Sequence, residues 1–163
     1  MRVRALEPTD SFTALTALLH AGYARLGALG LNYTAVDQDV ETTRRRATRG
    51  ACLVAELDGR LVGTLALWRG GPDEETERFR RADAFVLGQF AVDPAVQRRG
   101  VGAALLAEAE RVARAAGAVE VLGDTAETAT HLVEYYRRRG WYVVGSVHWP
   151  GKTYRSVLLA KAL

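Results

Sequence analysis

The sequence has little that would cross-link the chain or place it in a membrane. Its 163 residues include one cysteine, Cys52, so no internal disulfide can form. Cys52 lies in the apolar stretch Ala51–Leu57, a setting typical of a small buried side chain rather than a nucleophile. No apolar run is long enough to span a membrane, and the first ten residues lack the apolar core of a secretory signal. These absences favour a cytoplasmic protein.

The sequence also lacks a strong excess of charge of either sign. Lys and Arg total 22 against 19 Asp and Glu, a formal net charge of +3 that is too small to indicate nucleic-acid binding by itself. The arginines are nevertheless clustered, at 44–46, 80–81, 98–99 and 137–139. Such clusters on helices are usually solvated, whereas basic residues beside a glycine turn suit an anionic ligand. The length and the 48% hydrophobic content predict a single domain spanning residues 1–163.

Hydrophobic periodicity and turn residues predict an α/β architecture in which helices cover a mixed sheet. The expected order is β-α-α-β-β-β-α-β-α-β-β, with a hairpin turn at Asp58 and Gly59 and a bulge at Gly88. Thr9 or Asp10 is expected to cap the first helix. The expected strands cover residues 1–6, 51–57, 60–68, 84–92, 119–123, 141–147 and 153–163, and the expected helices cover about 10–30, 37–48, 101–116 and 127–139.

The stretch VDPAVQRRGVGAALLAEAE predicts a strand end, a turn and an amphipathic helix. Pro94 ends the strand, while Gly100 and Gly102 remove side chains at the helix start. The first N–H groups of a helix have no partners within it and carry about half a positive charge. Arg98 and Arg99 add full charges beside them. The turn is therefore a candidate site for an anion such as a diphosphate.

Two motifs give the sequence a family resemblance. QRRGVG, from Gln97 to Gly102, matches the Q/R-x-x-G-x-G/A signature of the GNAT superfamily of acetyl-CoA-dependent N-acetyltransferases, which the sequence resembles. A second family element, Y-x-x-x-G-[FW], corresponds to Tyr136–Trp141. The resemblance implies a mixed, mostly antiparallel sheet of about seven strands flanked by about four helices. It also implies acetyl-CoA as co-substrate, coenzyme A as product and no metal.

The resemblance places coenzyme A residue by residue. The diphosphate is expected on the turn, and the pantetheine arm is expected to pair with the preceding strand as an added strand does. The implied contacts are the main chain of Phe90, Ala91 and Val92, and the turn residues Gln97, Arg98, Arg99, Gly100, Val101, Gly102 and Ala103. Many members carry an asparagine seven residues before the tyrosine of the second motif. Here that position is Ala129, and His131 is a candidate to replace the contact.

Acetyl transfer to an amine needs a neutral nucleophile, a route for its proton and stabilisation of the departing thiolate. By resemblance Tyr136 is the general acid, although its place on an apolar helix face fits a core residue equally well. Tyr135 lies on another face and is the weaker candidate. The strand before the turn carries no carboxylate, and its Gln89 can position water but cannot take a proton.

The identity of the base therefore stays open in the sequence. The carboxylates and imidazole that could serve are Asp124, Glu127 and His148. Asp124 could instead cap the helix that follows it. A water relay is an equal alternative to any of these side chains.

The sequence as a whole predicts an enzyme that moves an acetyl group from acetyl-CoA to a primary amine of a small molecule or protein by direct attack on the thioester. The alternative is a non-catalytic acyl-CoA-binding or regulatory module on the same fold. By resemblance the acceptor meets residues 19–33, 69–83 and 148–154, and the carboxylates within 73–77 could attract cationic amines. No nucleic-acid or membrane partner is expected, and a homodimer is left open.

Overall fold

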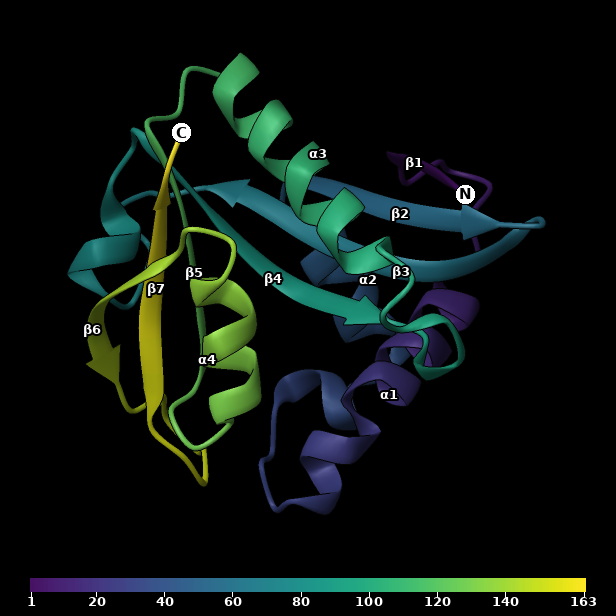
Figure 1. Ribbon diagram of the computed structural model, residues 1–163, viewed down its shortest axis with the longest axis horizontal. Helices are drawn as coiled ribbons and strands as arrows, with labels where there is room; N and C mark the ends of the chain where they lie inside the picture. The colour runs from purple at the N-terminus through teal and green to yellow at the C-terminus, as the bar shows by residue number, and fades with distance from the viewer.

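The computed structural model describes residues 1–163 and contains one seven-stranded sheet in the order β1-β2-β3-β4-β5-β7-β6 (Figure 1). All neighbouring strands are antiparallel except β4 and β5, which are parallel. The strands are β1 Arg2–Ala5, β2 Ala51–Leu57, β3 Arg60–Arg69, β4 Ala84–Val92, β5 Glu120–Ala126, β6 Tyr142–Val147 and β7 Ser156–Ala162. The α-helices are α1 Phe12–Ala28, α2 Val40–Ala47, α3 Val101–Ala115 and α4 Thr130–Arg137. The expected order of elements and the GNAT-type fold class are confirmed.

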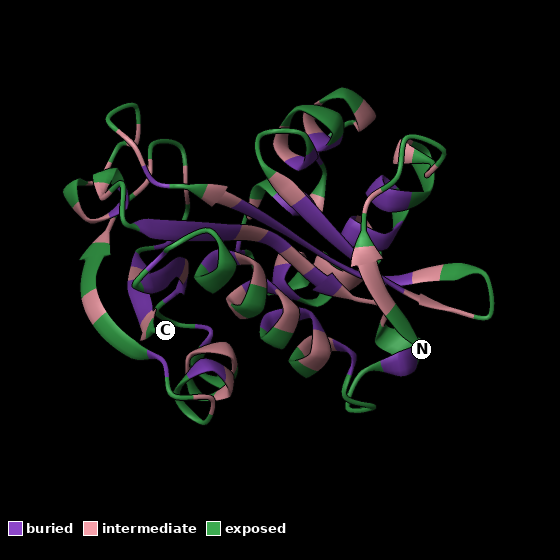
Figure 2. Cartoon of the chain, turned by 90° about the horizontal axis from the view of Figure 1, so that it is seen from above, coloured by how far each residue is buried: buried purple, intermediate pink, exposed green.

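The helices cover both faces of the sheet, and the buried residues gather along the strands between them (Figure 2). On one face, Leu105 of α3 and Tyr136 of α4 join the largest apolar cluster, which also contains Leu65 of β3. On the other face, Leu15 of α1 packs with Val54 of β2. No helix combines the length and the apolar content that a membrane span requires.

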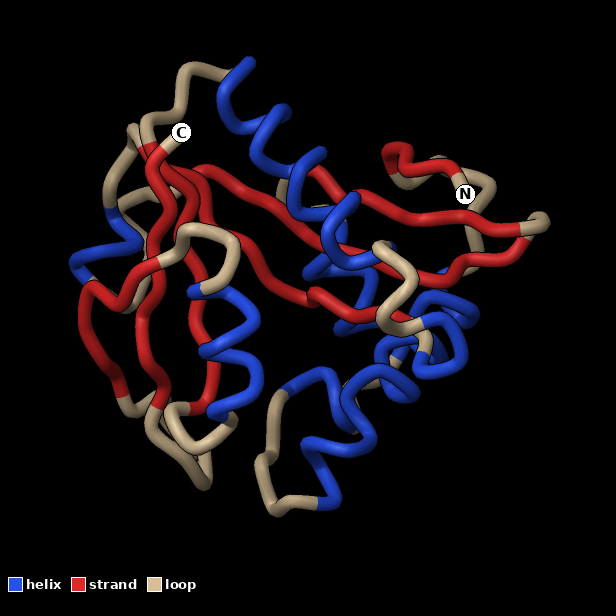
Figure 3. The backbone as a smooth tube through the Cα atoms, in the orientation of Figure 1, coloured by secondary structure: helices blue, strands red, loops and turns tan.

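The strands β4 and β5 pair only at their beginnings and then diverge, as Figure 3 shows. The pairs run from Ala84 with Glu120 to Val86 with Leu122 and stop there. Beyond this point β4 stays paired with β3, and β5 stays paired with β7. The β5-facing edge of β4 from Leu87 onward therefore has no partner strand. We call this feature the β4–β5 divergence.

The bulge expected at Gly88 lies one residue later. Gln89 has φ +50°, and the pairing of β3 with β4 shifts register beside it. The absence of a side chain at Gly88 has another cause: a Cβ there would lie 3.0 Å from the Trp68 ring. The glycine thus permits close packing, and the bulge turns the end of β4 away from β5.

Three local expectations about caps and burial have different outcomes. The cap of α1 is Ser11, whose hydroxyl accepts a hydrogen bond from the Ala14 amide at 3.2 Å, so the prediction of Thr9 or Asp10 was wrong. Asp124 lies inside β5, and residue 129 occupies the N-cap position of α4, so Asp124 is not a helix cap. Cys52 is buried as expected, and burial raises the pKa of its thiol to about 11.

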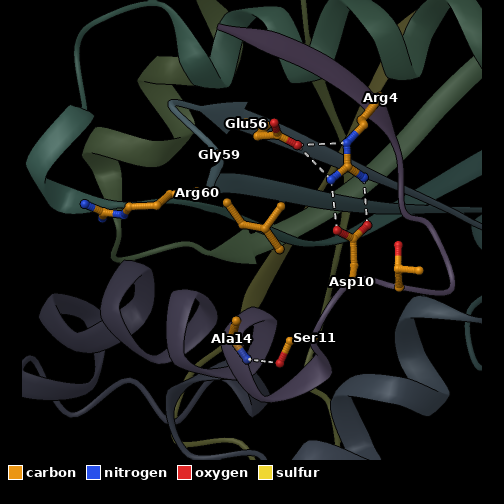
Figure 4. Close-up of a pocket in the computed structure, with 9 residues that line it drawn as sticks. Arg4, Asp10, Ser11, Ala14, Glu56, Gly59 and Arg60 are labelled. Carbon is orange, nitrogen blue, oxygen red and sulfur yellow. Dashed lines mark hydrogen bonds and ion pairs between the residues drawn. The ribbon is translucent and has the colours of Figure 1, made fainter.

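Asp10 serves instead in a charge network that fastens the amino-terminal strand (Figure 4). Arg4 donates to both carboxylate oxygens of Asp10, at 2.7 and 2.9 Å. The same guanidinium donates to Glu56 of β2 at 2.8 and 3.1 Å. This network joins β1, β2 and the chain entering α1 through one guanidinium bonded to two carboxylates.

Candidate functional site

The turn between β4 and α3 leaves several backbone N–H groups free. Arg98 has φ +64° and Gly100 has φ +84°, so the chain enters α3 through two left-handed residues. The first amide of α3 with a helical partner is that of Ala104, which donates to the Gly100 carbonyl at 3.0 Å. The amides of residues 101–103 are consequently unpaired at the positive end of the helix dipole.

The approach to this turn is unobstructed and positively charged. A Cβ at Gly100 would meet no atom within 4 Å. Gln97, Arg98 and Arg99 are exposed. Neither arginine takes part in an ion pair, so both charges are available to a ligand. The side chain of Gln97 donates to the Val92 carbonyl at 3.3 Å and so braces the turn against the end of β4.

Gly102 has a neighbour that the sequence did not indicate. A Cβ at Gly102 would lie 2.7 Å from the Tyr135 hydroxyl and 3.2 Å from the Phe90 ring. The Arg139 guanidinium lies 3.6 Å from the centre of the Tyr135 ring and holds it from the other side. Tyr135, the weaker of the two tyrosine candidates in the sequence, is therefore the one next to the turn.

Tyr136 combines a core ring with a free hydroxyl. Its ring packs edge-on against Trp141, with centroids 5.2 Å apart, and belongs to the main apolar cluster. Its hydroxyl has no protein hydrogen-bond partner and is not among the fully enclosed polar atoms. Burial raises the pKa of Tyr136 well above 10, and Tyr23, Tyr135 and Asp124 add to the shift. The phenol thus stays protonated at physiological pH.

Gln89 is committed to a buried polar network. Its side-chain carbonyl accepts a hydrogen bond from Gln38 at 2.7 Å, and the same Gln38 nitrogen lies 2.7 Å from the Thr43 hydroxyl. Thr43 in turn accepts from Thr16 of α1 at 2.8 Å. The network holds the bulge of β4 against α1 and α2, and it leaves only the Gln89 amide nitrogen without a protein partner.

The other candidates suggested by the sequence lie apart from Asp124. His131 and Glu127 are exposed and line a shallow groove formed by α4, β6 and β7. His148 is exposed and bonds through Nε2 to the Lys152 carbonyl at 2.8 Å. Ala129 is buried at the start of α4. Glu127 and His148 are thus exposed, and neither side chain forms a hydrogen bond with Asp124 or with a tyrosine beside it.

Asp124 is half-buried near the β4–β5 divergence. Its Oδ2 accepts a hydrogen bond from the Trp149 indole at 2.8 Å, and it forms no ion pair. Burial raises the pKa of the carboxyl, and the hydrogen bond from Trp149 opposes this shift only in part. A carboxylate with a raised pKa that forms no ion pair is a candidate proton acceptor.

Three tyrosines far apart in the chain form a row beside Asp124. The rings of Tyr33 and Tyr154 stack with centroids 4.8 Å apart, and Tyr23 lies 5.4 Å from Tyr33. The Tyr33 hydroxyl accepts a hydrogen bond from the Ala126 amide at 2.8 Å, which fixes the row to the end of β5. No local sequence pattern connects these residues, and only the fold brings them together.

Comparison with known proteins identifies the class to which this arrangement belongs. A family model described as the acetyltransferase (GNAT) family matches residues 18–141. S-(2-succino)cysteine N-acetyltransferase of Bacillus subtilis (strain 168) is 29% identical over 167 residues, covering 99% of this chain and 96% of that protein. Ribosomal-protein-alanine N-acetyltransferase from Brucella melitensis has a TM-score of 0.70 at 22% identity, over 100% of both chains. A Bacillus subtilis acetyltransferase in complex with CoA has a TM-score of 0.70 at 19% identity, covering 99% of this chain and 98% of that one.

The chain belongs to the GNAT family of acetyltransferases. It is an N-acetyltransferase, and its co-substrate is acetyl-CoA. An enzyme of this class requires an amine acceptor. The alternative of a non-catalytic acyl-CoA-binding module finds no support in these similarities.

Proposed function

We propose that the protein transfers the acetyl group of acetyl-CoA to a primary amine by direct attack, at the β4–β5 divergence. The observation that carries the proposal is the unobstructed turn, where three amides and two unpaired arginines face outward at the end of β4. Residues 97–103 would hold the diphosphate. The unpaired edge formed by Phe90, Ala91 and Val92 would pair with the pantetheine arm. When bound, acetyl-CoA supplies an activated acyl group.

Asp124 is the proposed proton acceptor. An alkylammonium group has a pKa of about 10.4, so neutralising it at pH 7 costs roughly 4–5 kcal/mol. A carboxylate that forms no ion pair, such as that of Asp124, can take the proton as the amine nitrogen bonds to the acetyl carbon and the carbon–sulfur bond breaks. Gln89 would contribute only by holding a water through its free amide nitrogen. His131, exposed on α4, remains a candidate contact for coenzyme A.

Tyr136 is the proposed hydrogen-bond donor to the departing sulfur. A thiol has a pKa of about 8.5, below that of this buried phenol. Full proton transfer from Tyr136 to the thiolate is therefore uphill. The hydroxyl stabilises the developing negative charge by donating a hydrogen bond, and it keeps its proton through most of the reaction.

The test measures turnover of acetyl-CoA by the purified protein with a panel of amines. Turnover is detected as release of the free thiol of coenzyme A. The panel contains amino acids, polyamines and an amino-terminal peptide, with S-(2-succino)cysteine included because the Bacillus subtilis relative is named for it. Acceptor-dependent thiol release supports the proposal, and its loss in Asp124→Asn supports the assigned base. Binding of coenzyme A without turnover of any amine would contradict it. The proposal takes residues 1–163 as one cytoplasmic domain, and light scattering distinguishes a monomer from a homodimer.

A further inference from the structure

Arg46 is a half-buried arginine that forms no ion pair. It is the last of three consecutive arginines on α2, and unlike Arg44 and Arg45 it is half-buried. Its Nη1 donates to the side-chain carbonyl of Gln38 at 2.5 Å, and Nη2 lies 3.9 Å from where a Cβ of Gly88 would be. No carboxylate forms an ion pair with it. Burial lowers its pKa, and the charge of Asp124 opposes this shift only in part.

Lys152 is a second cation of the same kind. It is half-buried, and its Nζ donates to the carbonyl of Asn32 at 2.8 Å and to the hydroxyl of Thr34 at 3.0 Å, both neutral acceptors. Burial lowers the pKa of Lys152, and the positive charge of Arg46 lowers it further. The two cations therefore repel each other, and no ion pair compensates either charge.

Asp124 is the carboxylate that faces these two cations. A Cβ at Gly123 would lie 3.3 Å from the Leu87 side chain, and the residues that follow these two, Asp124 and Gly88, lie where the strands begin to diverge. The guanidinium of Arg46 lies next to Gly88 on the β4 side, and the charge of Asp124 acts on both Arg46 and Lys152. Asp37, which is exposed, is the other acidic group whose charge acts on Lys152. Three half-buried charged groups thus lie around the row of tyrosines. Arg46 and Lys152 are positive, and Asp124 is negative.

From this charge distribution we infer that the acceptor is an amine that also carries a carboxylate, and that Arg46 and Lys152 bind this carboxylate while Asp124 receives the amine. The inference rests on the proposed function and adds the substrate class. A guanidinium with free donors suits a carboxylate, which can accept two parallel hydrogen bonds. The tyrosine row supplies an apolar wall for the part of the acceptor between its two charged ends.

The structure gives less support to the expectation that the carboxylates of residues 73–77 attract cationic acceptors. Glu74 is already engaged there, as it forms an ion pair with Arg49 and accepts from the Trp68 indole at 2.8 Å. The charges nearest to Asp124 are positive and half-buried, so a polyamine would meet repulsion there. The structure thus assigns an anionic rather than a polycationic acceptor.

The experiment compares matched acceptors that differ only in the carboxylate. Leucine and methionine are tested against their α-carboxamides, with spermidine as a polycation, in wild type, Arg46→Gln, Lys152→Gln and the exposed control Arg45→Gln. We expect kcat/KM to favour each acid over its amide by about 10- to 100-fold, the range of a hydrogen bond to a charged group. We expect Arg46→Gln to abolish this preference, Lys152→Gln to reduce it, and Arg45→Gln to retain it.

The outcomes separate the inference from the function on which it rests. Calorimetric titration with coenzyme A and thermal unfolding of each variant show whether the fold and the cofactor turn are intact. Equal use of acids and amides by wild type, or a preference for spermidine, overturns the inference while leaving acetyl transfer in place. An unchanged preference in folded Arg46→Gln also overturns it. Absence of turnover with every amine contradicts the proposed function itself.

Discussion

The hydroxyl of Tyr135 fills the space above Gly102, 2.7 Å from where a Cβ would lie. The ring of the next residue, Tyr136, packs edge-on against Trp141 instead, and the charges of Tyr23 and Asp124 help to raise the pKa of its phenol. Two consecutive tyrosines of α4 thus meet two different parts of the site. Tyr135 lies beside the turn proposed to hold the diphosphate, and Tyr136 lies beside the proposed point of reaction.

Removing the hydroxyl of either tyrosine therefore separates their contributions. We expect Tyr136→Phe to lower kcat about 10- to 1000-fold with little change in the KM for acetyl-CoA, because the donor acts mainly on the departing sulfur. Tyr135→Phe is the matched control and should leave kcat near the wild-type value. Steady-state kinetics on both variants is the measurement. Equal kcat in wild type and Tyr136→Phe would leave Tyr136 as a core residue only.

Substituting Asp124 should lower activity and raise stability together. Burial makes the ionised carboxylate unfavourable in the folded protein, so its folded pKa lies above its unfolded value. Such a group penalises folding once the pH exceeds the unfolded pKa. We expect Asp124→Asn, which can still accept from Trp149, to unfold at a higher temperature than wild type at pH 7. The difference should shrink as the pH falls toward about 4, the unfolded value.

The same raised pKa sets the pH dependence of turnover. A base must be ionised, so kcat/KM of the wild type should fall as the pH drops through the raised pKa of Asp124. The acidic limb should be absent from any residual activity of Asp124→Asn. Initial rates from pH 5 to 9, with a stability check at each pH, provide the measurement. An identical acidic limb in both proteins would point to a water relay instead of Asp124.

The two glycines of the turn should respond to alanine for different reasons. Gly100 has φ +84° with open space around it. Gly100→Ala should therefore lower the free energy of unfolding by about 1–2 kcal/mol through backbone strain. Gly102→Ala instead collides with the Tyr135 hydroxyl and should weaken coenzyme A binding by displacing that ring. Adding Tyr135→Phe removes the colliding atom, and so the double variant should regain affinity. Calorimetry of the four proteins tests the coupling; additive losses would disprove it.

The network of Arg4 should contribute to stability in a manner that depends on pH. Hydrogen bonds from Arg4 lower the pKa of Asp10, so the pair stabilises the fold above the ordinary carboxyl pKa of about 3.9 and loses this effect as the pH falls through the lowered value. Asp10→Asn should lower the free energy of unfolding by about 1–3 kcal/mol at pH 7, because the side chains of Arg4 and Asp10 are both largely buried. Urea unfolding at several pH values is the measurement.

An exposed ion pair supplies the control for this prediction. Glu134 and Arg138 bond at 2.9 Å on the outer surface of α4, with side chains 52% and 74% exposed. Glu134→Gln should change the free energy of unfolding by about 0.5 kcal/mol or less. A similar small effect for Asp10→Asn at pH 7 would show that the network at the amino terminus is not a stabilising one.

The architecture was predictable because its signals are local. The hairpin turn at Asp58 and Gly59 has positive φ at both residues, as an Asp-Gly turn requires. The start of α3 at Val101 follows from the glycines and the apolar stripe behind them. Strand boundaries were harder to predict at glycines, because a glycine can either end a strand or allow close packing within it. Gly123 suggested the end of a strand, yet β5 continues to Ala126 because it pairs with β7 that far, and the glycine instead lets Leu87 pack closely.

The site was only half predictable. The cofactor turn is one continuous segment, and its motif is visible in the sequence. The row of Tyr23, Tyr33 and Tyr154 comes from separate parts of the chain, and nothing near any of them indicates the others. Arg46 was hidden in a run of arginines, because a sequence does not show which of three neighbours points inward. These features depend on long-range packing, which local periodicity does not encode.

The segments that complete this cluster are joined across almost the whole chain. The side chain of Asn32 accepts from the Thr153 amide at 2.8 Å, a bond that spans 121 residues. The strands β1–β6, α1 and the cofactor turn are all synthesised before Thr153 exists. A ribosome must therefore release nearly the entire chain before the residues around Asp124 can assemble. Contacts of such sequence separation form late, so a chain cut short before the β6–β7 loop would have no catalytic cluster, however well its earlier elements had folded.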